Sequence, residues 1–184
     1  GRAARVAAAL DRVAVDGRRP RRGDADGDAR HARSADRPGL GPAEEAEGLE
    51  LFENKCRVCH ATDLFTDDSF RNNGLDASFE KDSGRERITE FEGDRGKFKV
   101  PGLRNVALTS PYMHDGRFNT LQQVLDHYAS NVKNSETLDP VLKQGESLGI
   151  RLSEQEKLKL IAFLNTLSDN EFTHDKRFAN PFVK

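Results

Sequence analysis

The chain has 184 residues, a length that allows one domain with a tail. Its 29 basic and 31 acidic residues give a formal net charge of −2, which is too balanced to indicate a nucleic-acid partner. No run of about 18 apolar residues occurs, so the sequence predicts no membrane span.

Residues 1–41 differ in composition from the rest of the chain. They are rich in arginine, aspartate, alanine and glycine and contain no lysine, glutamate or aromatic residue. Such a stretch cannot bury a hydrophobic core, so we expect a disordered or solvated linker. Its composition also resembles a misread GC-rich reading frame, and a non-native origin is the alternative. The ordered domain is therefore expected over 42–184.

A first helix is expected to begin at Gly41 and Pro42. Proline suits the first helical turn, and three glutamates follow where the helix dipole favours negative charge. Phe52 and Cys56 lie on the apolar stripe of this helix. Gly48 either permits a close crossing with another helix or is simply a tolerated helix glycine.

This helix leads into a Cys-x-x-Cys-His motif formed by Cys56, Cys59 and His60. Two cysteines one helical turn apart can attach the vinyl groups of a haem through thioethers, while the histidine binds the iron. The alternatives are a thioredoxin-like redox pair, half of a zinc site, or chance. The chain has no other cysteine for a Cys₄ zinc site, and no strand–helix–strand context for a redox pair is visible. The motif therefore predicts one covalently bound haem c.

The middle of the chain is expected to be rich in loops. Phe65, Phe70 and Phe79 are candidates for packing in the core or against a haem, and the core is favoured for each of them. The Asn-Asn-Gly sequence at 72–74 is typical of a turn, and the charged stretch 82–96 is expected to be an exposed loop. No strand is convincingly indicated.

Two further helices are expected towards the C-terminus. One begins at the capping residue Thr120 and places Tyr128 on the same apolar face as Leu121, Val124 and Leu125. The second begins at a capping box that starts at Ser153 and buries four aliphatic residues, namely Leu160, Ile161, Leu164 and Leu167. A first helix that ends in Cys-x-x-Cys-His and a last helix of this kind predict a mostly α, cytochrome c-like fold with long loops around one haem.

Several motifs resemble the dihaem cytochrome c peroxidase and MauG family. They are Gly-Lys-Phe-Lys-Val-Pro (96–101), Leu-Arg-Asn-Val (103–106), Thr-Ser-Pro-Tyr-Met-His-Asp-Gly-Arg-Phe (109–118) and Leu-x-x-Leu-Ser-Asp (164–169), which follow the Cys-x-x-Cys-His motif in the family's order. The resemblance covers about 42–184 and corresponds to the second, C-terminal haem domain of that family. Neither the first domain, with its peroxidatic haem, nor the family's tryptophan between the haems has a counterpart here.

The resemblance implies that Cys56 and Cys59 hold the haem and that His60 is the proximal ligand of the iron. The family places its sixth ligand, a methionine or a tyrosine, fourteen positions beyond the histidine of the His-Asp-Gly turn. In this chain that position is Tyr128, which we favour. Met113, the only methionine, is the alternative ligand. A phenolate stabilises ferric iron, whereas a thioether favours the ferrous state.

Other family sites are also implied by the resemblance. Thr109 and Pro111 match backbone-carbonyl ligands of a calcium ion, for which oxygen ligands are suitable. Arg104 and Lys97 are candidates to pair with haem propionates, with an ordinary surface salt bridge as the alternative. His114 is a candidate for a hydrogen bond near the haem edge. The remaining histidines are expected to be ordinary surface or helix residues: His31, His127 and His174.

These features predict a c-type haem electron-transfer domain of a dihaem peroxidase-like or MauG-like oxidoreductase, which in its complete form reduces hydrogen peroxide. The alternatives are a free-standing monohaem electron shuttle and, third, a structural or sensory haem module. The implied partners are an electron-donor protein, either a small cytochrome or a copper protein, and a peroxidatic haem domain or subunit. Because haem is attached covalently outside the cytoplasmic membrane, we expect a periplasmic protein.

Overall fold

The structure is a computed structural model that describes residues 41–182, so the prediction for 1–41 and His31 lies outside the described residues apart from Gly41. The helices are α2 (Pro42–Lys55), α3 (Glu86–Thr89), α4 (Leu121–Asp126), α5 (Glu154–Thr166) and α6 (Asn170–Thr173). Short 3₁₀ turns are η1 (Glu92–Asp94), η2 (Val106–Leu108), η4 (Pro140–Leu142) and η5 (Lys176–Phe178), and η3 (His127–Asn131) is a π-helical turn. The expected mostly α character is confirmed.

Strands make up a small part of the described chain. β1 (Phe70–Arg71) pairs antiparallel with β2 (Phe98–Lys99), and β3 (Lys143–Gln144) pairs antiparallel with β4 (Ser147–Leu148). Each strand has two residues, which is too short for the alternation of apolar and polar residues that reveals a strand in a sequence. This explains why the sequence analysis expected none.

The helix α2 begins as the sequence predicts. The Gly41 backbone N–H donates to Glu44 Oε2 at 2.8 Å, and Pro42 occupies the first turn, where its missing N–H costs nothing. The buried face carries Phe52, which is 2% exposed. The helix ends at Lys55, immediately before the two cysteines.

The helix α5 also begins at the predicted capping box. Ser153 Oγ accepts the Glu156 N–H at 3.2 Å, while Glu156 Oε2 accepts the Ser153 N–H at 2.8 Å. Lys55 Nζ donates to Glu156 at 2.7 Å, which ties the end of α2 to the start of α5. Most of the predicted aliphatic face is buried, with Leu160 only 1% exposed.

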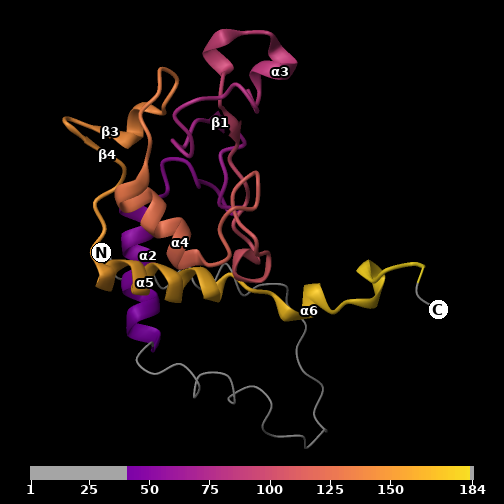
Figure 1. Cartoon of the computed structure of the whole chain (residues 1–184). Coiled ribbons are helices and arrows are strands. Elements are labelled where there is room, and N and C mark those ends of the chain that lie inside the picture. Colours follow the sequence, from indigo (N-terminus) through magenta and orange to yellow (C-terminus); the bar gives the residue numbers. More distant parts are fainter. Residues whose placement is uncertain (1–40, 183–184) are drawn as a thin grey trace, which may run out of the picture. The chain divides into compact units, whose positions relative to one another are not determined.

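The helices α2 and α5 cross each other (Figure 1). At the crossing, Gly48 of α2 lies against the backbone of α5. Gly48 is buried, and a Cβ atom built there would lie 2.0 Å from the carbonyl oxygen of Lys159 and 2.9 Å from Cβ of Phe163. The backbones approach too closely for any side chain. Of the two interpretations of this glycine, the close crossing is confirmed.

We therefore expect Gly48→Ala to destabilise the protein by roughly 2–3 kcal/mol, because the methyl group must push α5 away from α2. This cost outweighs the roughly 1 kcal/mol that alanine gains over glycine in helix propensity. Denaturant unfolding of the purified protein measures the change. Glu50→Ala, at an exposed position of the same helix, is the control and is expected to change the free energy of unfolding by less than about 0.5 kcal/mol. Equal stability of Gly48→Ala and wild type would refute the tight crossing.

The main hydrophobic core lies between α2, α4 and α5. Phe52 packs at ring-centroid distances of 5.1 Å from Phe163 and 5.6 Å from Phe65. The other buried members of this cluster are Leu125, Leu160, Leu164 and Leu167. Phe65 is therefore a core residue, as favoured from the sequence. A second cluster formed by Val132, Leu138 and Leu142 packs against Tyr128.

The segment 82–96 is exposed, as expected, but it is ordered by ion pairs rather than being a featureless loop. It contains α3 and η1, with Arg85 bound to Asp94 at 3.1 Å and Arg95 to Glu86 at 2.9 Å. The Arg85 guanidinium also lies 4.0 Å above the ring of Phe70, which is 37% exposed. Phe70 is therefore not a core residue, because a cation rather than the core covers its ring.

None of the helices between residues 41 and 182 combines the length and the apolar character that crossing a membrane requires.

Candidate functional site

The two cysteines lie on the turns that follow directly after α2. The Cys56 N–H donates a helical hydrogen bond to the Phe52 carbonyl at 2.8 Å. The N–H groups of Cys59 and His60 both donate to the Cys56 carbonyl, at 3.2 and 3.0 Å respectively. The last turn of the helix therefore continues through the motif. Cys56 and Cys59 are free thiols, and both are half-buried.

Burial keeps both thiols neutral. It raises the pKa of Cys56 to about 12, with a smaller contribution from the charge of Cys59. Burial also raises the pKa of Cys59, which the nearby Arg71 guanidinium opposes. A redox cysteine pair needs a lowered pKa that supplies a thiolate, so these pKa directions argue against the thioredoxin-like alternative.

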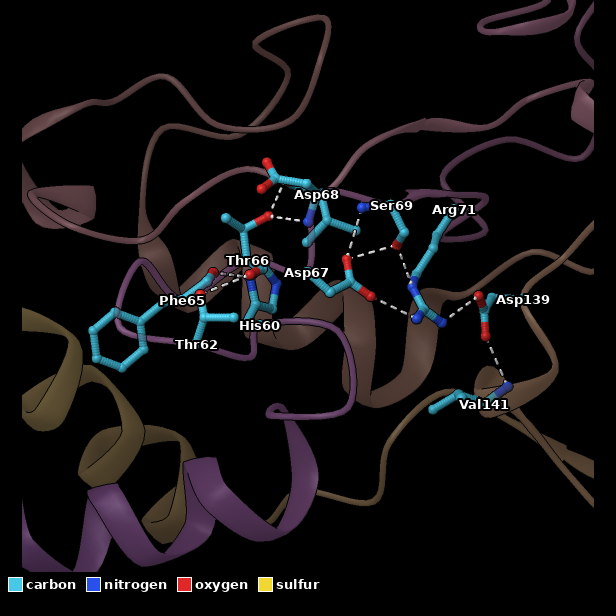
Figure 2. Close-up of polar contacts among 11 residues, drawn as sticks. His60, Thr62, Phe65, Thr66, Asp67, Asp68, Ser69, Arg71, Asp139 and Val141 are labelled. Atoms are coloured by element: carbon cyan, nitrogen blue, oxygen red, sulfur yellow. Dashed lines mark hydrogen bonds and ion pairs between the residues drawn. The ribbon is translucent and has the colours of Figure 1, made fainter. Parts of the chain in front are cut away.

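The ring of His60 is held by a backbone carbonyl. Its Nδ1 lies 3.0 Å from the Phe65 carbonyl oxygen (Figure 2). Burial lowers the pKa of His60, although hydrogen bonds to the carbonyls of Phe65 and Pro101 oppose this effect. A carbonyl can only accept, so the neutral ring carries its proton on Nδ1 and keeps the lone pair on Nε2. A histidine that binds a metal through Nε2 is commonly held in this way.

Two threonines fix the loop that presents this carbonyl. Thr62 Oγ1 donates to the Thr66 carbonyl at 3.0 Å (Figure 2). Thr66 Oγ1 donates to the Val100 carbonyl at 2.7 Å. Thr66 is 5% exposed. Since these bonds close the loop around Phe65, the orientation of the His60 ring follows from the local fold.

An ion-pair network lies beside the motif. The Asp67 N–H bonds the Cys59 carbonyl at 3.0 Å, and Arg71 bridges Asp67 at 2.7 Å and Asp139 at 3.0 Å (Figure 2). Burial raises the pKa of Asp67, but hydrogen bonds from Ser69 and Arg71 outweigh it and hold the pKa at about 2. The network connects the Cys59–His60 turn to Asp139, the residue directly before η4. The sequence analysis missed it, because Arg71 and Asp139 lie 68 positions apart.

Tyr128 lies on the π-helical turn η3, where its backbone carbonyl accepts the Ile150 N–H at 2.7 Å. Burial raises the pKa of its phenol to about 12; the charges of Cys59 and Cys56 raise it further, and a hydrogen bond from the Asn73 side chain lowers it. The Tyr128 side chain packs against the cluster of Val132, Leu138 and Leu142.

Met113, the alternative sixth ligand, contacts the side chain of Asn73. Its Sδ atom lies 3.5 Å from Asn73 Nδ2, and its backbone has a positive φ of 73° in the turn that precedes Gly116. The Met113 sulfur therefore contacts the Asn73 side chain, whereas Tyr128 packs against the cluster of Val132, Leu138 and Leu142. Proximity alone does not choose between them, and the assignment of Tyr128 stays a prediction.

Arg104 and Lys97, the candidate partners of the haem propionates, both bond to other groups of the protein in this structure. Arg104 is exposed, and its Nε donates to the Asp63 carbonyl at 3.0 Å, three residues after His60. Lys97 pairs with Asp94 at 3.3 Å, which is the surface salt bridge given as its alternative. Arg104 lies near the motif along the chain, and its role towards a propionate stays a prediction.

The predicted calcium ligands, Thr109 and Pro111, are both exposed in the turns around η2. Within residues 41–182, no three His, Cys, Asp or Glu side chains gather in a group suited to a metal ion. That search concerns side chains, whereas the two predicted ligands are backbone carbonyls. The calcium assignment stays a prediction.

The histidine predictions have different outcomes. Of the two expected settings for His127, surface or helix, the structure shows the helical one: His127 lies on the turn η3, is only 2% exposed, and its Nε2 lies 3.0 Å from the Asn73 carbonyl oxygen. Its position directly before Tyr128 on an amphipathic helix was the available signal. His114 stacks on Phe98 at a ring-centroid distance of 3.5 Å, and His174 is exposed as expected.

The candidate donors are two neutral thiols one turn apart, an imidazole with a lone pair on Nε2, and the half-buried side chains of Tyr128 and Met113. Thiols of this spacing can form two thioethers, and the imidazole and phenol can bind an iron ion axially. The residues present therefore fit a c-type haem.

Comparison with known proteins places these features in a family, although no family model matches the chain. The chain is 39% identical over 127 residues to the methylamine utilization protein MauG of Methylorubrum extorquens, covering 68% of this chain and 35% of that protein. It is 33% identical over 132 residues to the cytochrome c551 peroxidase of Nitrosomonas europaea, covering 70% of this chain and 35% of that protein.

Comparison with solved structures points to the same family. A MauG-like protein associated with microbial copper homeostasis superimposes with a TM-score of 0.64 at 32% identity, over 79% of this chain and 52% of that one. The chain spans about a third of the length of the two curated relatives. The resemblance seen in its motifs is thus confirmed, and the chain is a domain of the MauG and dihaem cytochrome c peroxidase family.

Proposed function

We propose that residues 42–184 form a c-type haem electron-transfer domain with a cytochrome c-like arrangement around one haem. Cys56 and Cys59 would attach the haem, with His60 as the proximal ligand and Tyr128 as the sixth. The observation that carries the proposal is the His60 ring, which the Phe65 carbonyl holds at 3.0 Å with Nε2 available, one residue after two neutral thiols.

When bound, a haem c supplies a one-electron couple between ferric and ferrous iron. The residues of this chain hold and tune that couple. His60 donates through Nε2 while the Phe65 carbonyl accepts its Nδ1 proton, which strengthens the imidazole as a donor. Tyr128 would hold the iron through its phenol oxygen as a phenolate, which would favour the oxidised state. The core around Phe52 limits the access of water.

In the complete protein this domain would pass electrons to a peroxidatic haem domain or subunit, where hydrogen peroxide is reduced. The names of the relatives, MauG and cytochrome c peroxidase, support this oxidoreductase role. The proposed electron donor is a small cytochrome or copper protein, and the proposed location is the periplasm, because that is where haem c is attached. Calcium at the Thr109 and Pro111 carbonyls is part of the proposal.

Peroxide turnover by the haem-loaded chain tests the division of labour. We expect turnover near that of a buffer control, because His60 and Tyr128 fill both axial positions and leave no iron site for peroxide. Stopped-flow measurement of peroxide consumption with a reduced electron donor is the assay. Tyr128→Ala, which opens one axial position, is expected to raise the rate at least about tenfold. Rapid turnover by the unaltered chain would contradict the electron-transfer assignment.

A further inference from the structure

The hairpin of β3 and β4 lies against the turn that carries Tyr128. The Gly149 N–H donates to the Leu142 carbonyl at 2.8 Å, which closes the hairpin. The next residue, Ile150, donates its N–H to the Tyr128 carbonyl at 2.7 Å. This carbonyl stands three residues before the end of η3, where helical carbonyls lack partners within the helix. The hairpin therefore supplies the hydrogen bond that the Tyr128 backbone needs.

Gly149 makes this close approach possible. It is buried and has a positive φ of 89°. A Cβ atom built there would lie 2.3 Å from the Tyr128 carbonyl oxygen and 3.4 Å from Cγ2 of Val132. The first distance is far inside van der Waals contact, and a backbone oxygen cannot turn aside as the end of a flexible side chain can. Any side chain at this position must therefore move either the hairpin or Tyr128.

The segments on both sides of Tyr128 are tied to other parts of the domain. Before it, Lys157 of α5, which is 5% exposed, donates to Asp126 at 2.5 Å. After it, the Lys133 N–H donates to the Gly74 carbonyl at 2.7 Å. Because both ends of η3 are fixed, a displacement imposed by the hairpin falls on the turn itself and not on the segment as a whole.

We infer that Gly149 is a positioning residue for the sixth ligand of the iron. Because it has no side chain, the hairpin backbone lies directly against the Tyr128 carbonyl and fixes the point from which the Tyr128 side chain extends. The inference rests on the proposed function, since it concerns the ligand of a haem held by Cys56 and Cys59. It adds a residue from a separate hairpin that neither the motif nor the ligand spacing identifies.

The physical consequence is that a methyl group at this position weakens Tyr128 as a ligand without removing its phenol. A ligand binds well only when its donor atom is held within about 0.5 Å of the required place. The overpacked methyl group shifts the backbone that carries the donor. We expect the ratio of tyrosine-ligated to other ferric forms to fall at least about tenfold in Gly149→Ala.

Absorption spectra of the haem-loaded ferric protein test the inference. Gly149→Ala should move the spectrum towards that of Tyr128→Phe. Adding Gly149→Ala to Tyr128→Phe should cause no further change, because the ligand on which Gly149 acts is then absent. A wild-type spectrum in Gly149→Ala would overturn the inference, and so would an equal additional change in the double variant.

Gly145 is the matched control, because it belongs to the same hairpin and has a positive φ of 62°, yet a Cβ atom there meets nothing within 4 Å. Gly145→Ala therefore carries the backbone strain of alanine at positive φ without the clash. Both variants are expected to lower the midpoint of thermal unfolding, but only Gly149→Ala should change the ferric spectrum. The same spectral change in Gly145→Ala would attribute it to general strain in the hairpin and overturn the role of Gly149.

Leu148→Ala decides the question if Gly149→Ala does not fold. Leu148 packs against the same cluster as Tyr128, so its truncation loosens the hairpin without adding a side chain beside the Tyr128 carbonyl. A spectral change towards that of Tyr128→Phe would support the inference, and a wild-type spectrum would overturn it. Failure of the proposed function is separately visible, because the wild-type chain would then carry no covalent haem or Tyr128→Phe would leave the ferric spectrum unchanged.

Discussion

A Cys56→Ala/Cys59→Ala variant is expected to lose covalently bound haem completely. When the wild-type chain is produced together with a haem-maturation system, its band should keep haem stain through denaturing electrophoresis. The double variant should not, because no other cysteine in the chain can form a thioether. The geometric reason is that the two free thiols lie on consecutive turns that end at His60.

The matched control is Val58→Ala, which changes an exposed side chain between the two cysteines. It should keep its stain and the wild-type absorption spectrum. Each single cysteine variant retains one thiol and should keep a reduced amount of stain. Stain retained by the double variant, or missing from the wild-type band, would disprove covalent attachment and with it the proposed domain function.

Elements whose signals are local could be predicted from the sequence. The start of α2 follows from the Gly41–Glu44 cap, and that of α5 from the Ser153–Glu156 box. Thr120 likewise begins α4, with its Oγ1 accepting the Gln123 N–H at 3.2 Å. These interactions join residues three apart, so the printed order of residues contains the whole of the signal.

Contacts between distant segments could not be predicted in this way. The bonds from Arg71 to Asp139 and from Asn72 to Ser135 join loops with no periodic pattern, and many other charged or polar residues were equally good partners. The π-helical turn at His127–Asn131 widens the helix by tertiary packing, which a count of 3.6 residues per turn does not include. His127 lies in this turn, and its burial was not predicted from the sequence.

For the same reason, only the contiguous part of the candidate site could be predicted from the residues themselves. The Cys-x-x-Cys-His motif is contiguous, so its residues could be named and the structure places them on one pair of turns. The sixth ligand depends on which distant segment folds over the motif. The ligand spacing of the family that the chain resembles indicated Tyr128. The structure adds that the Met113 sulfur contacts the Asn73 side chain, which no spacing rule foresaw.

Tyr128→Phe is expected to change the ferric absorption spectrum strongly and to raise the midpoint potential of the haem-loaded protein by on the order of 100 mV. Removing the phenol oxygen takes away an anionic ligand that stabilises ferric iron, so the ferrous state becomes relatively more stable. The Tyr128 ring contacts the cluster around Val132, and phenylalanine preserves that packing. Potentiometric titration followed by absorption measures both effects.

Met113→Leu is the companion variant, because it removes the other candidate ligand at similar volume. We expect a wild-type ferric spectrum and a potential within about 30 mV of wild type, half of the 59 mV that a tenfold change in a one-electron equilibrium produces. The unaltered protein should also lack the sulfur-to-iron band. In the opposite pattern, wild type shows the band, Met113→Leu loses it, and Tyr128→Phe leaves the ferric spectrum unchanged. That result would assign the iron to Met113. In that case Tyr128 would serve only to pack against the cluster of Val132, Leu138 and Leu142.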